Sequence, residues 1–131
     1  MHLTIPGIPQ AKQRPRMTKT GHTYTPKQTR DYEALIKKCW KEQSGETLED
    51  GPLKAYITAY LPIPKNTKKA VHEKMRTGEI RPTKKPDLDN IIMVLDALNG
   101  LAFPDDKNIV EITAEKYYST ETRLEIRIEH K

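Results

Sequence analysis

Alternation of apolar and polar residues predicts four strands along the chain. The clearest run is 53–61, where Leu, Ala or Ile occupies every second position and Lys, Tyr or Thr lies between them. Shorter runs of the same kind lie at 3–5 and 124–128. Side chains two residues apart point to the same face of a strand, so each run predicts a strand with one buried face.

A fourth strand is predicted from Ile109 to about Tyr118. Its buried face is expected to carry Val110, Ile112 and Ala114. Residues 119–122 are Ser, Thr, Glu and Thr. We expect them to form the turn of a hairpin that returns the chain into the last strand.

Two segments have apolar residues at helical spacing. The face of the first consists of Tyr32, Leu35, Ile36, Cys39 and Trp40. Thr25-Pro26-Lys27-Gln28 has the cap residue, first-turn proline and glutamine that start a helix, and Ser44-Gly45 ends it. Trp40 is therefore expected to be a core residue rather than a platform for a ligand.

The second helical segment ends at Asn99-Gly100, and its apolar residues are Leu88, Ile91, Ile92, Leu95 and Leu98. A short basic helix is also predicted within 67–77, and the two prolines of 81–86 require extended chain. The elements follow the order β-α-β-(α)-α-β-β. This order predicts an α+β fold, with a mixed sheet of about four strands and helices packed on it.

The length of 131 residues predicts a single domain over 1–131. Hydrophobic residues make up 35% and charged residues 31%, which is somewhat polar for this length and fits a shared core in an oligomer. No run is long enough to span a membrane, and the N-terminus lacks the pattern of a secretory signal, so we expect a cytoplasmic protein. Cys39 is the only cysteine and is predicted to be a small buried hydrophobe.

The net charge of +5 is unevenly distributed along the chain. One basic segment runs from Lys12 to Lys27 without an acidic residue. A second, 65–85, has eight Lys or Arg residues and only Glu73 and Glu79 as acidic ones. Basic segments are commonly just solvated surface, but two of them flanking acidic motifs favour a polyanionic partner.

Acidic residues gather on either side of the second helical segment. Asp87 and Asp89 lie at its start, and Asp96 lies within it. Asp105 and Asp106 lie on the loop that follows, so the two pairs converge if this loop doubles back. Carboxylates that lie together repel one another unless a divalent cation binds among them. A site made only of carboxylates favours Mg²⁺ or Mn²⁺ over Zn²⁺, and such ions activate water in many nucleases.

Simpler interpretations of these aspartates remain open. Asp87 can serve as a helix cap, and Asp105-Asp106 after Pro104 is ordinary turn chemistry. An EF-hand is excluded, because the sixth position from Asp87 is Ile92 rather than Gly and the twelfth is Leu98 rather than Glu. The chain also has no Gly-rich phosphate loop and no Cys/His spacing of a zinc site, and its four histidines are scattered.

The aspartates belong to three longer motifs. These are Lys85-Pro86-Asp87-Leu88-Asp89-Asn90, Leu95-Asp96-Ala97-Leu98-Asn99-Gly100 and Phe103-Pro104-Asp105-Asp106. In this order and spacing they resemble the signature of the RusA family of Holliday-junction resolvases. The opening segments Ile5-Pro6-Gly7-Ile8-Pro9 and Lys12-Gln13-Arg14-Pro15-Arg16 also look like the start of family members, often those carried by phages and prophages. The resemblance spans nearly the whole chain.

This resemblance implies a small homodimer that binds a four-way DNA junction and makes paired nicks with Mg²⁺, for which Mn²⁺ can substitute. The essential acidic ligands of the family fall on Asp87, Asp89 and Asp106. Asp105 is implied as a helper in the metal site, and Asp96 either supports the site or belongs to the polar surface. Contacts to DNA phosphates are expected from Lys12, Arg14, Arg16, Lys84, Lys85 and Lys107. A two-fold dimer presents two sites to the two equivalent strands of a junction.

One position departs from the family pattern. Members often have a lysine four residues after the second aspartate of the D-L-D motif, where this chain has Met93. On a helix this position lies on the face of Asp89, so a lysine there would reach the site or the DNA. Lys84, Lys85 or Lys107 are candidates to substitute for it. Alternatively, Met93 packs against a dimer partner.

Two other functions compete with junction cleavage. The first is a DNA-junction-binding protein that cleaves weakly or not at all, although the presence of all the aspartates argues against it. The second is a single-strand-binding module. It is disfavoured because aromatic residues make up only 6% of the chain, which leaves few rings for stacking on bases.

Overall fold

The central strand β4 (Leu53–Pro62) follows the predicted alternation, with every inward side chain buried and every outward one half-buried. It belongs to a four-stranded sheet of order β1-β6-β4-β5 in the computed structural model, which describes residues 1–131. β1 (His2–Pro6) and β4 both run antiparallel to β6 (Arg123–His130). β5 (Ile109–Ser119) runs parallel to β4. The predicted α+β fold with a mixed sheet is confirmed.

β5 and β6 follow one another in the chain but do not pair, so the predicted hairpin is wrong. β4 lies between them. The connection passes the end of β4, where Pro62 is the partner of Ser119 and Tyr60 is the partner of Arg123. Two strands separated by a third lie about 10 Å apart, which about three extended residues can span. A short polar turn therefore suits this crossing as well as it suits a hairpin.

β5 has an irregularity near its start. Leu53 is the partner of Ile109 and Lys54 is the partner of Glu111, so Val110 is an extra residue in the strand. The prediction that Val110 lies on the buried face is wrong, because this bulge gives the inward position to Ile109. Val110 is 60% exposed. Ile112, also predicted to be buried, is 42% exposed because β5 is an edge strand.

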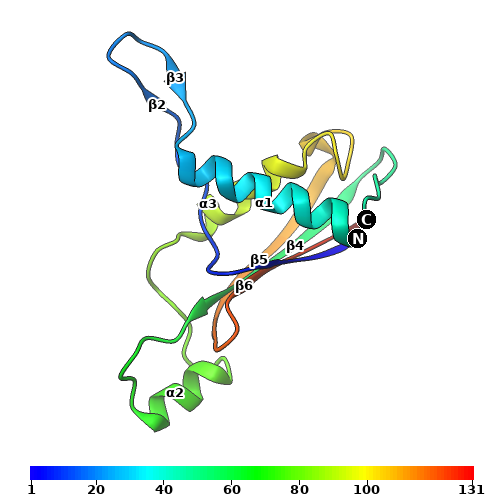
Figure 1. Ribbon diagram of the computed structural model, residues 1–131. Coiled ribbons are helices and arrows are strands. Elements are labelled where there is room, and N and C mark those ends of the chain that lie inside the picture. Colours follow the sequence, from blue (N-terminus) through cyan, green and yellow to red (C-terminus); the bar gives the residue numbers. More distant parts are fainter.

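Helices cover one face of the sheet (Figure 1). The longest, α1 (Lys27–Gln43), packs against β1, and its predicted apolar face enters a core of 20 buried residues. Cys39 is buried in this core, as predicted, and Trp40 packs against it. No helix of the chain combines the length and hydrophobicity needed to cross a bilayer.

The start of α1 differs from the prediction. Pro26, not Thr25, occupies the cap position, and no side chain caps the helix. The predicted capping box is therefore wrong, and the first turn binds the N-terminal segment instead. The N–H of Gln13 donates to Thr29 Oγ1 at 3.0 Å, and Gln13 Nε2 donates to Gln28 Oε1 at 3.4 Å.

The second helical segment is split into two kinds of helix. α3 (Leu88–Ile92) is α-helical, but the chain continues as a 3₁₀ helix, η1 (Met93–Leu98). Buried Ile91, Val94 and Ala97 recur every three residues, which is the period of a 3₁₀ helix. The prediction of one regular helix over 88–98 is thus wrong in its second half, although the apolar residues do enter the core.

Two arms project from the sheet and its helices (Figure 1). The hairpin arm, within the first basic segment, pairs β2 (Arg16–Met17) with β3 (Thr23–Tyr24). Its two-residue strands are too short for alternation to predict them. The α2 arm is formed by α2 (Lys69–Arg76), which confirms the short basic helix expected there. In Figure 1, α3, which follows Asp87 and contains Asp89, lies between the two arms.

Candidate active site

The start of α3 presents two exposed carboxylates. Asp87 occupies the cap position, yet its side chain accepts no cap hydrogen bond. Only its carbonyl oxygen takes part in the helix, accepting the N–H of Ile91 at 3.0 Å. The Asp89 carboxylate accepts the N–H of Asn90 at 3.0 Å. Asp87 is therefore the cap residue by position, as the simpler interpretation had it, but its side chain does not cap the helix, and its carboxylate is available to a ligand.

α3 has only five residues, and neighbouring segments hold it in place. Lys116 of β5 donates from Nζ to the carbonyl oxygens of Lys84 at 2.7 Å and Pro86 at 3.1 Å. From the N-terminal segment, the N–H of Lys12 donates to the carbonyl oxygen of Asn90 at 3.0 Å. These contacts fix the chain on both sides of Asp87 and Asp89.

The second pair of aspartates has divided roles. Asp105 caps a short 3₁₀ helix, η2 (Asp106–Asn108). Its carboxylate accepts the N–H of Lys107 at 3.4 Å, and its own N–H donates to Asn108 Oδ1 at 3.2 Å. The turn interpretation is thus confirmed for Asp105. The N–H of Asp106 donates to Asn99 Oδ1 at 3.1 Å, and the residue is exposed.

Asp105 and Asp106 differ in how readily they lose a proton. The hydrogen bond between their carboxyl groups, helped by the backbone N–H of Lys107, lowers the pKa of Asp105. The same contact raises the pKa of Asp106, and desolvation and the charges of Asp105 and Asp96 add to this. Carboxylates that face each other favour a retained proton or a bound cation.

The four predicted metal ligands do not form one group as their side chains stand. No three His, Cys, Asp or Glu side chains are placed to hold a metal ion. Asp96, whose charge acts on Asp106, is itself paired with Lys12 at 3.2 Å. Exposed carboxylates have the donor chemistry that suits Mg²⁺, whereas their present placement does not complete a coordination shell.

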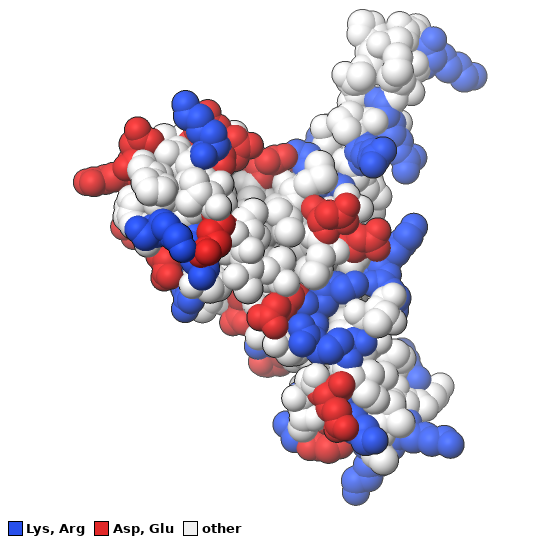
Figure 2. Space-filling view, turned by 180° about the vertical axis from the view of Figure 1, so that it is seen from behind, with Lys and Arg blue, Asp and Glu red and all other residues white.

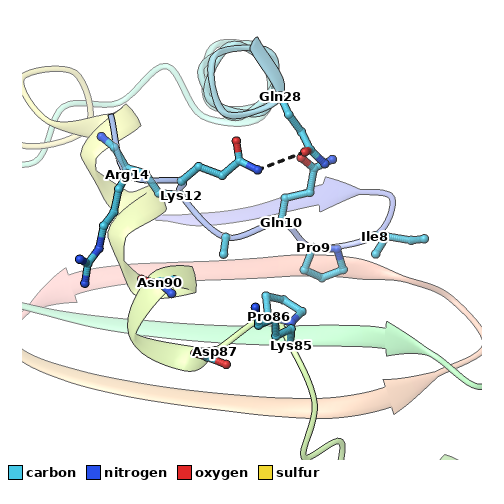
Figure 3. A pocket seen from close by; sticks show the side chains of 12 residues that line it. Ile8, Pro9, Gln10, Lys12, Arg14, Gln28, Lys85, Pro86, Asp87 and Asn90 are labelled. Atoms are coloured by element: carbon cyan, nitrogen blue, oxygen red, sulfur yellow. Dashed lines mark hydrogen bonds between the residues drawn. The ribbon is translucent and has the colours of Figure 1, made fainter. Parts of the chain in front are cut away.

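A groove of about 680 Å³ lies beside Asp87 (Figure 3). Residues 8–14 form one wall and Lys85, Pro86 and Asp87 belong to the other. Lys12 and Arg14 add two further cations to the same groove. A phosphate chain held by Arg14 and Lys85 would therefore pass alongside the Asp87 carboxylate.

Comparison with known proteins places the chain in a family. Residues 6–129 match the family described as Endodeoxyribonuclease RusA. The chain belongs to the RusA family. It is also 36% identical, over 132 residues, to the "Uncharacterized protein YqaN" of Bacillus subtilis (strain 168), which covers 95% of this chain and 92% of that protein. The resemblance of the three central motifs to RusA is thus confirmed over nearly the whole chain.

Most of the residues expected to bind DNA in this RusA-family chain are free to do so. The exposed ones are Arg14, Arg16, Lys84, Lys85 and Lys107. Lys12 differs, because its Nζ lies 3.2 Å from Asp96 and 3.7 Å from Glu33. It ties the N-terminal segment to η1 and α1, so its charge is already partly neutralised.

Charge is arranged across the face that carries the two arms. Figure 2 shows acidic side chains between the arms, with Lys and Arg side chains above and below them. Arg16 belongs to the hairpin arm, and Lys69, Lys74 and Arg76 belong to the α2 arm. Cations on both sides of a carboxylate group suit a polyanion that crosses this face.

Several residues of the site were not predicted from the sequence. Gln10, Gln13, Gln28 and Asn90 line the groove, and Lys116 holds the segment that enters α3. Uncharged amides carry no spacing or charge signal. The hints were that Gln10 and Gln13 lie in or beside the N-terminal motifs that resemble the RusA family, and that Asn90 ends the first of the three central motifs.

Proposed function

We propose that the chain is a structure-selective DNA endonuclease that resolves four-way junctions by paired hydrolysis of phosphodiester bonds, in DNA recombination and repair. Membership of the RusA family supports the class of reaction. The observation that carries the proposal is the free Asp87 carboxylate on a cation-lined groove. This groove lies on a face flanked by two basic arms.

Mg²⁺ is the proposed cofactor, with Mn²⁺ as a substitute. Asp87, Asp89 and Asp106 would hold the ion, and Asp105 would assist. When bound, such an ion activates water and stabilises the charge that develops at phosphorus. The raised pKa of Asp106 supports a cation at this position, because a cation offsets the repulsion from Asp105 and Asp96.

The residues of the chain bind and orient the DNA. Arg14 and Lys85, which line the same groove as Asp87, would contact the phosphates. Lys116 and Lys12 fix the two ends of the segment that carries Asp87, as their hydrogen bonds to backbone carbonyls indicate. The scissile phosphate is thereby placed beside the Asp87 carboxylate. Because the backbone at Asp87 is already fixed, the reaction does not have to order it, which saves conformational entropy.

We also propose that the enzyme is a homodimer. A four-way junction has two equivalent strands to cut, and a two-fold dimer offers two equivalent sites. The outer edge of β5 has no partner strand, and Val110 and Ile112 on it are exposed. An unpaired edge with apolar side chains is a suitable surface for a second copy.

A junction-binding protein with weak cleavage is the second candidate. Two observations favour it: Met93 stands where family members often have lysine, and the carboxylates are not gathered into a metal site. Both candidates bind four-way junctions, so only cleavage distinguishes them.

An end-labelled synthetic four-way junction, incubated with the protein with and without Mg²⁺, tests the proposal. We expect symmetric nicks in two opposing strands with Mg²⁺ only, and none in a linear duplex of the same sequence. Asp87→Asn, Asp89→Asn and Asp106→Asn should each abolish the nicks but bind the junction at least as well, because each removes a negative charge that faces phosphates. Asp31→Asn, on the exposed side of α1, is the matched control. Full activity of Asp89→Asn would contradict the site, and binding without nicks by the wild type would favour the second candidate.

A further inference from the structure

The hairpin arm, residues 16–24, projects from the groove beside Asp87. Arg14, before the arm, and Gln28, after it, both line this groove. The hydrogen bond of 3.4 Å from Gln13 Nε2 to Gln28 Oε1, drawn in Figure 3, joins the two sides of the base of the arm. DNA bound in the groove would therefore meet the arm close to the carboxylate that is proposed to act in cleavage.

The arm is a hydrogen-bonded hairpin that has no core of its own. Every residue from 14 to 24 is exposed. At its tip the N–H of Thr18 donates to the carbonyl oxygen of His22 at 2.8 Å, and the N–H of His22 donates to Thr18 Oγ1 at 3.2 Å. Gly21 supplies the positive φ of 86° in this turn. Because the arm buries nothing, its side chains contribute little to the stability of the fold and are free to contact a partner.

The charge of the arm and its base indicates what this partner is. The sequence has no acidic residue between Lys12 and Asp31. Arg14, Arg16 and Lys19 take part in none of the ion pairs of the structure. Figure 2 shows Lys and Arg side chains on this arm. Unpaired cations without neighbouring carboxylates are complementary to the phosphates of DNA.

Two of the four strand residues of the arm are large and apolar. Met17 is 69% exposed and Tyr24 is 47% exposed. Arg16 is the partner of Tyr24, whereas Met17 is the partner of Thr23. Partners in an antiparallel pair share a face and neighbours along a strand do not, so Met17 and Tyr24 point to opposite faces of the hairpin. Single exposed apolar residues are common on protein surfaces, but a thin ribbon with one on each face suits insertion between two base pairs.

We propose that the hairpin arm is a wedge that enters the branch point of a four-way junction. Met17 contacts the base pair on one side of the arm, and Tyr24 contacts the base pair on the other. An apolar wedge between base pairs costs the free energy of their stacking. At a branch point the stack is already interrupted, so this cost is lower than in a continuous duplex. The inference rests on the proposed function and gives a physical reason for its selectivity for junctions.

Binding of labelled DNA without divalent metal tests the inference independently of cleavage. We expect the wild type to bind a four-way junction more tightly than a linear duplex of the same sequence. Met17→Thr/Tyr24→Thr keeps the charge and the strand preference of the arm but removes both apolar side chains. It should lower the affinity for the junction about 5- to 100-fold, as the loss of base stacking does elsewhere, and leave the affinity for the duplex and the melting temperature unchanged. Val71→Thr, at an exposed apolar residue of the α2 arm, is the matched control and should bind both DNAs as the wild type does.

A probe at the branch point makes the result specific to a wedge. 2-Aminopurine placed there should become more fluorescent when the wild type binds, because it loses its stacking, and should change less with the saturating double variant. A double variant with the wild-type preference for junctions, or a branch point that stays stacked when the wild type is bound, would overturn the role of the arm and leave the nuclease proposal intact. Loss of the preference in Val71→Thr would overturn it as well. A wild type that binds junction and duplex equally would contradict the proposed function and the inference together.

Discussion

The salt dependence of junction binding follows from which cations the structure leaves free. The exposed residues expected to contact phosphates are Arg14, Arg16, Lys84, Lys85 and Lys107. Each neutralised phosphate contributes about −0.9 to the slope of log affinity against log salt concentration. Five contacts therefore predict a slope of about −4.5 per protomer. Lys12 is left out because it is paired with Asp96 and Glu33.

Removal of two cations gives a measurable change. The double variant Arg14→Gln/Arg16→Gln should have a slope of about −2.7 per protomer. Between about 50 and 200 mM salt, affinity should then fall about 40-fold per protomer, compared with about 500-fold for the wild type. Lys12→Gln should leave the slope nearly unchanged. Fluorescence anisotropy of a labelled four-way junction, in NaCl without divalent metal, measures all three slopes.

Two results would refute this reasoning. One is a double variant with the slope of the wild type, since Arg14 and Arg16 would then make no phosphate contacts. The other is a Lys12→Gln variant whose slope becomes less negative by as much as the loss of one free cation predicts. Lys37→Gln/Lys41→Gln, two exposed residues of α1, removes the same charge away from the groove and is the control.

Three further predictions follow from the structure. Met93 is 41% exposed and lies one turn after Asp89. A lysine there would add a positive charge near the carboxylates, so Met93→Lys should raise the cleavage rate, by less than about 100-fold. Dissociation to monomer without faster cleavage would instead make Met93 an interface residue. Ile112→Asp places a charge on the free edge of β5 and should yield monomers by light scattering, whereas an unchanged dimer would exclude this edge as the interface. Burial raises the pKa of Tyr32 to about 12, an effect that the nearby N–H of Gln10 reduces only in part. Because the folded-state pKa of Tyr32 is above the ordinary value, the free energy of unfolding should fall as pH rises from about 10 to 12. At about pH 11, urea unfolding should show that the wild type has lost about 1.4 kcal/mol more than Tyr32→Phe. Equal losses in the two proteins would contradict the burial of this hydroxyl.

The four strands of the main sheet could be predicted from the sequence, but their order in the sheet could not. β4 has an uninterrupted alternation because one of its faces is buried along its whole length. Its position between β5 and β6 depends on tertiary packing, which no local pattern encodes. The bulge at Val110 could not be predicted either. Ile109 and Val110 are both apolar, so either of them can be the first inward-facing residue of the strand.

The sequence singles out the aspartates, whose metal site stays a prediction, whereas the groove beside Asp87 could not be predicted. Asp87, Asp89 and Asp106 stand in motifs with fixed spacing. Lys12 was predicted to bind DNA because it lies in a basic segment, but its partner Asp96 is 84 residues away in the chain. Charge patterns along a sequence show which residues are basic, whereas only the fold shows which of them are already paired.

The place of β6 in the sheet constrains when this protein can fold during its synthesis. β6 lies between β1 and β4 and is the last of the strands to leave the ribosome. Until then β1 has no partner strand, and β4 can pair only with β5. The early strands therefore have to stay unpaired, or be held by a chaperone, while the rest of the chain is made. Premature termination before residue 123 would release a chain without the middle of its sheet, and we expect degradation of such products rather than the survival of shortened, partly active enzymes.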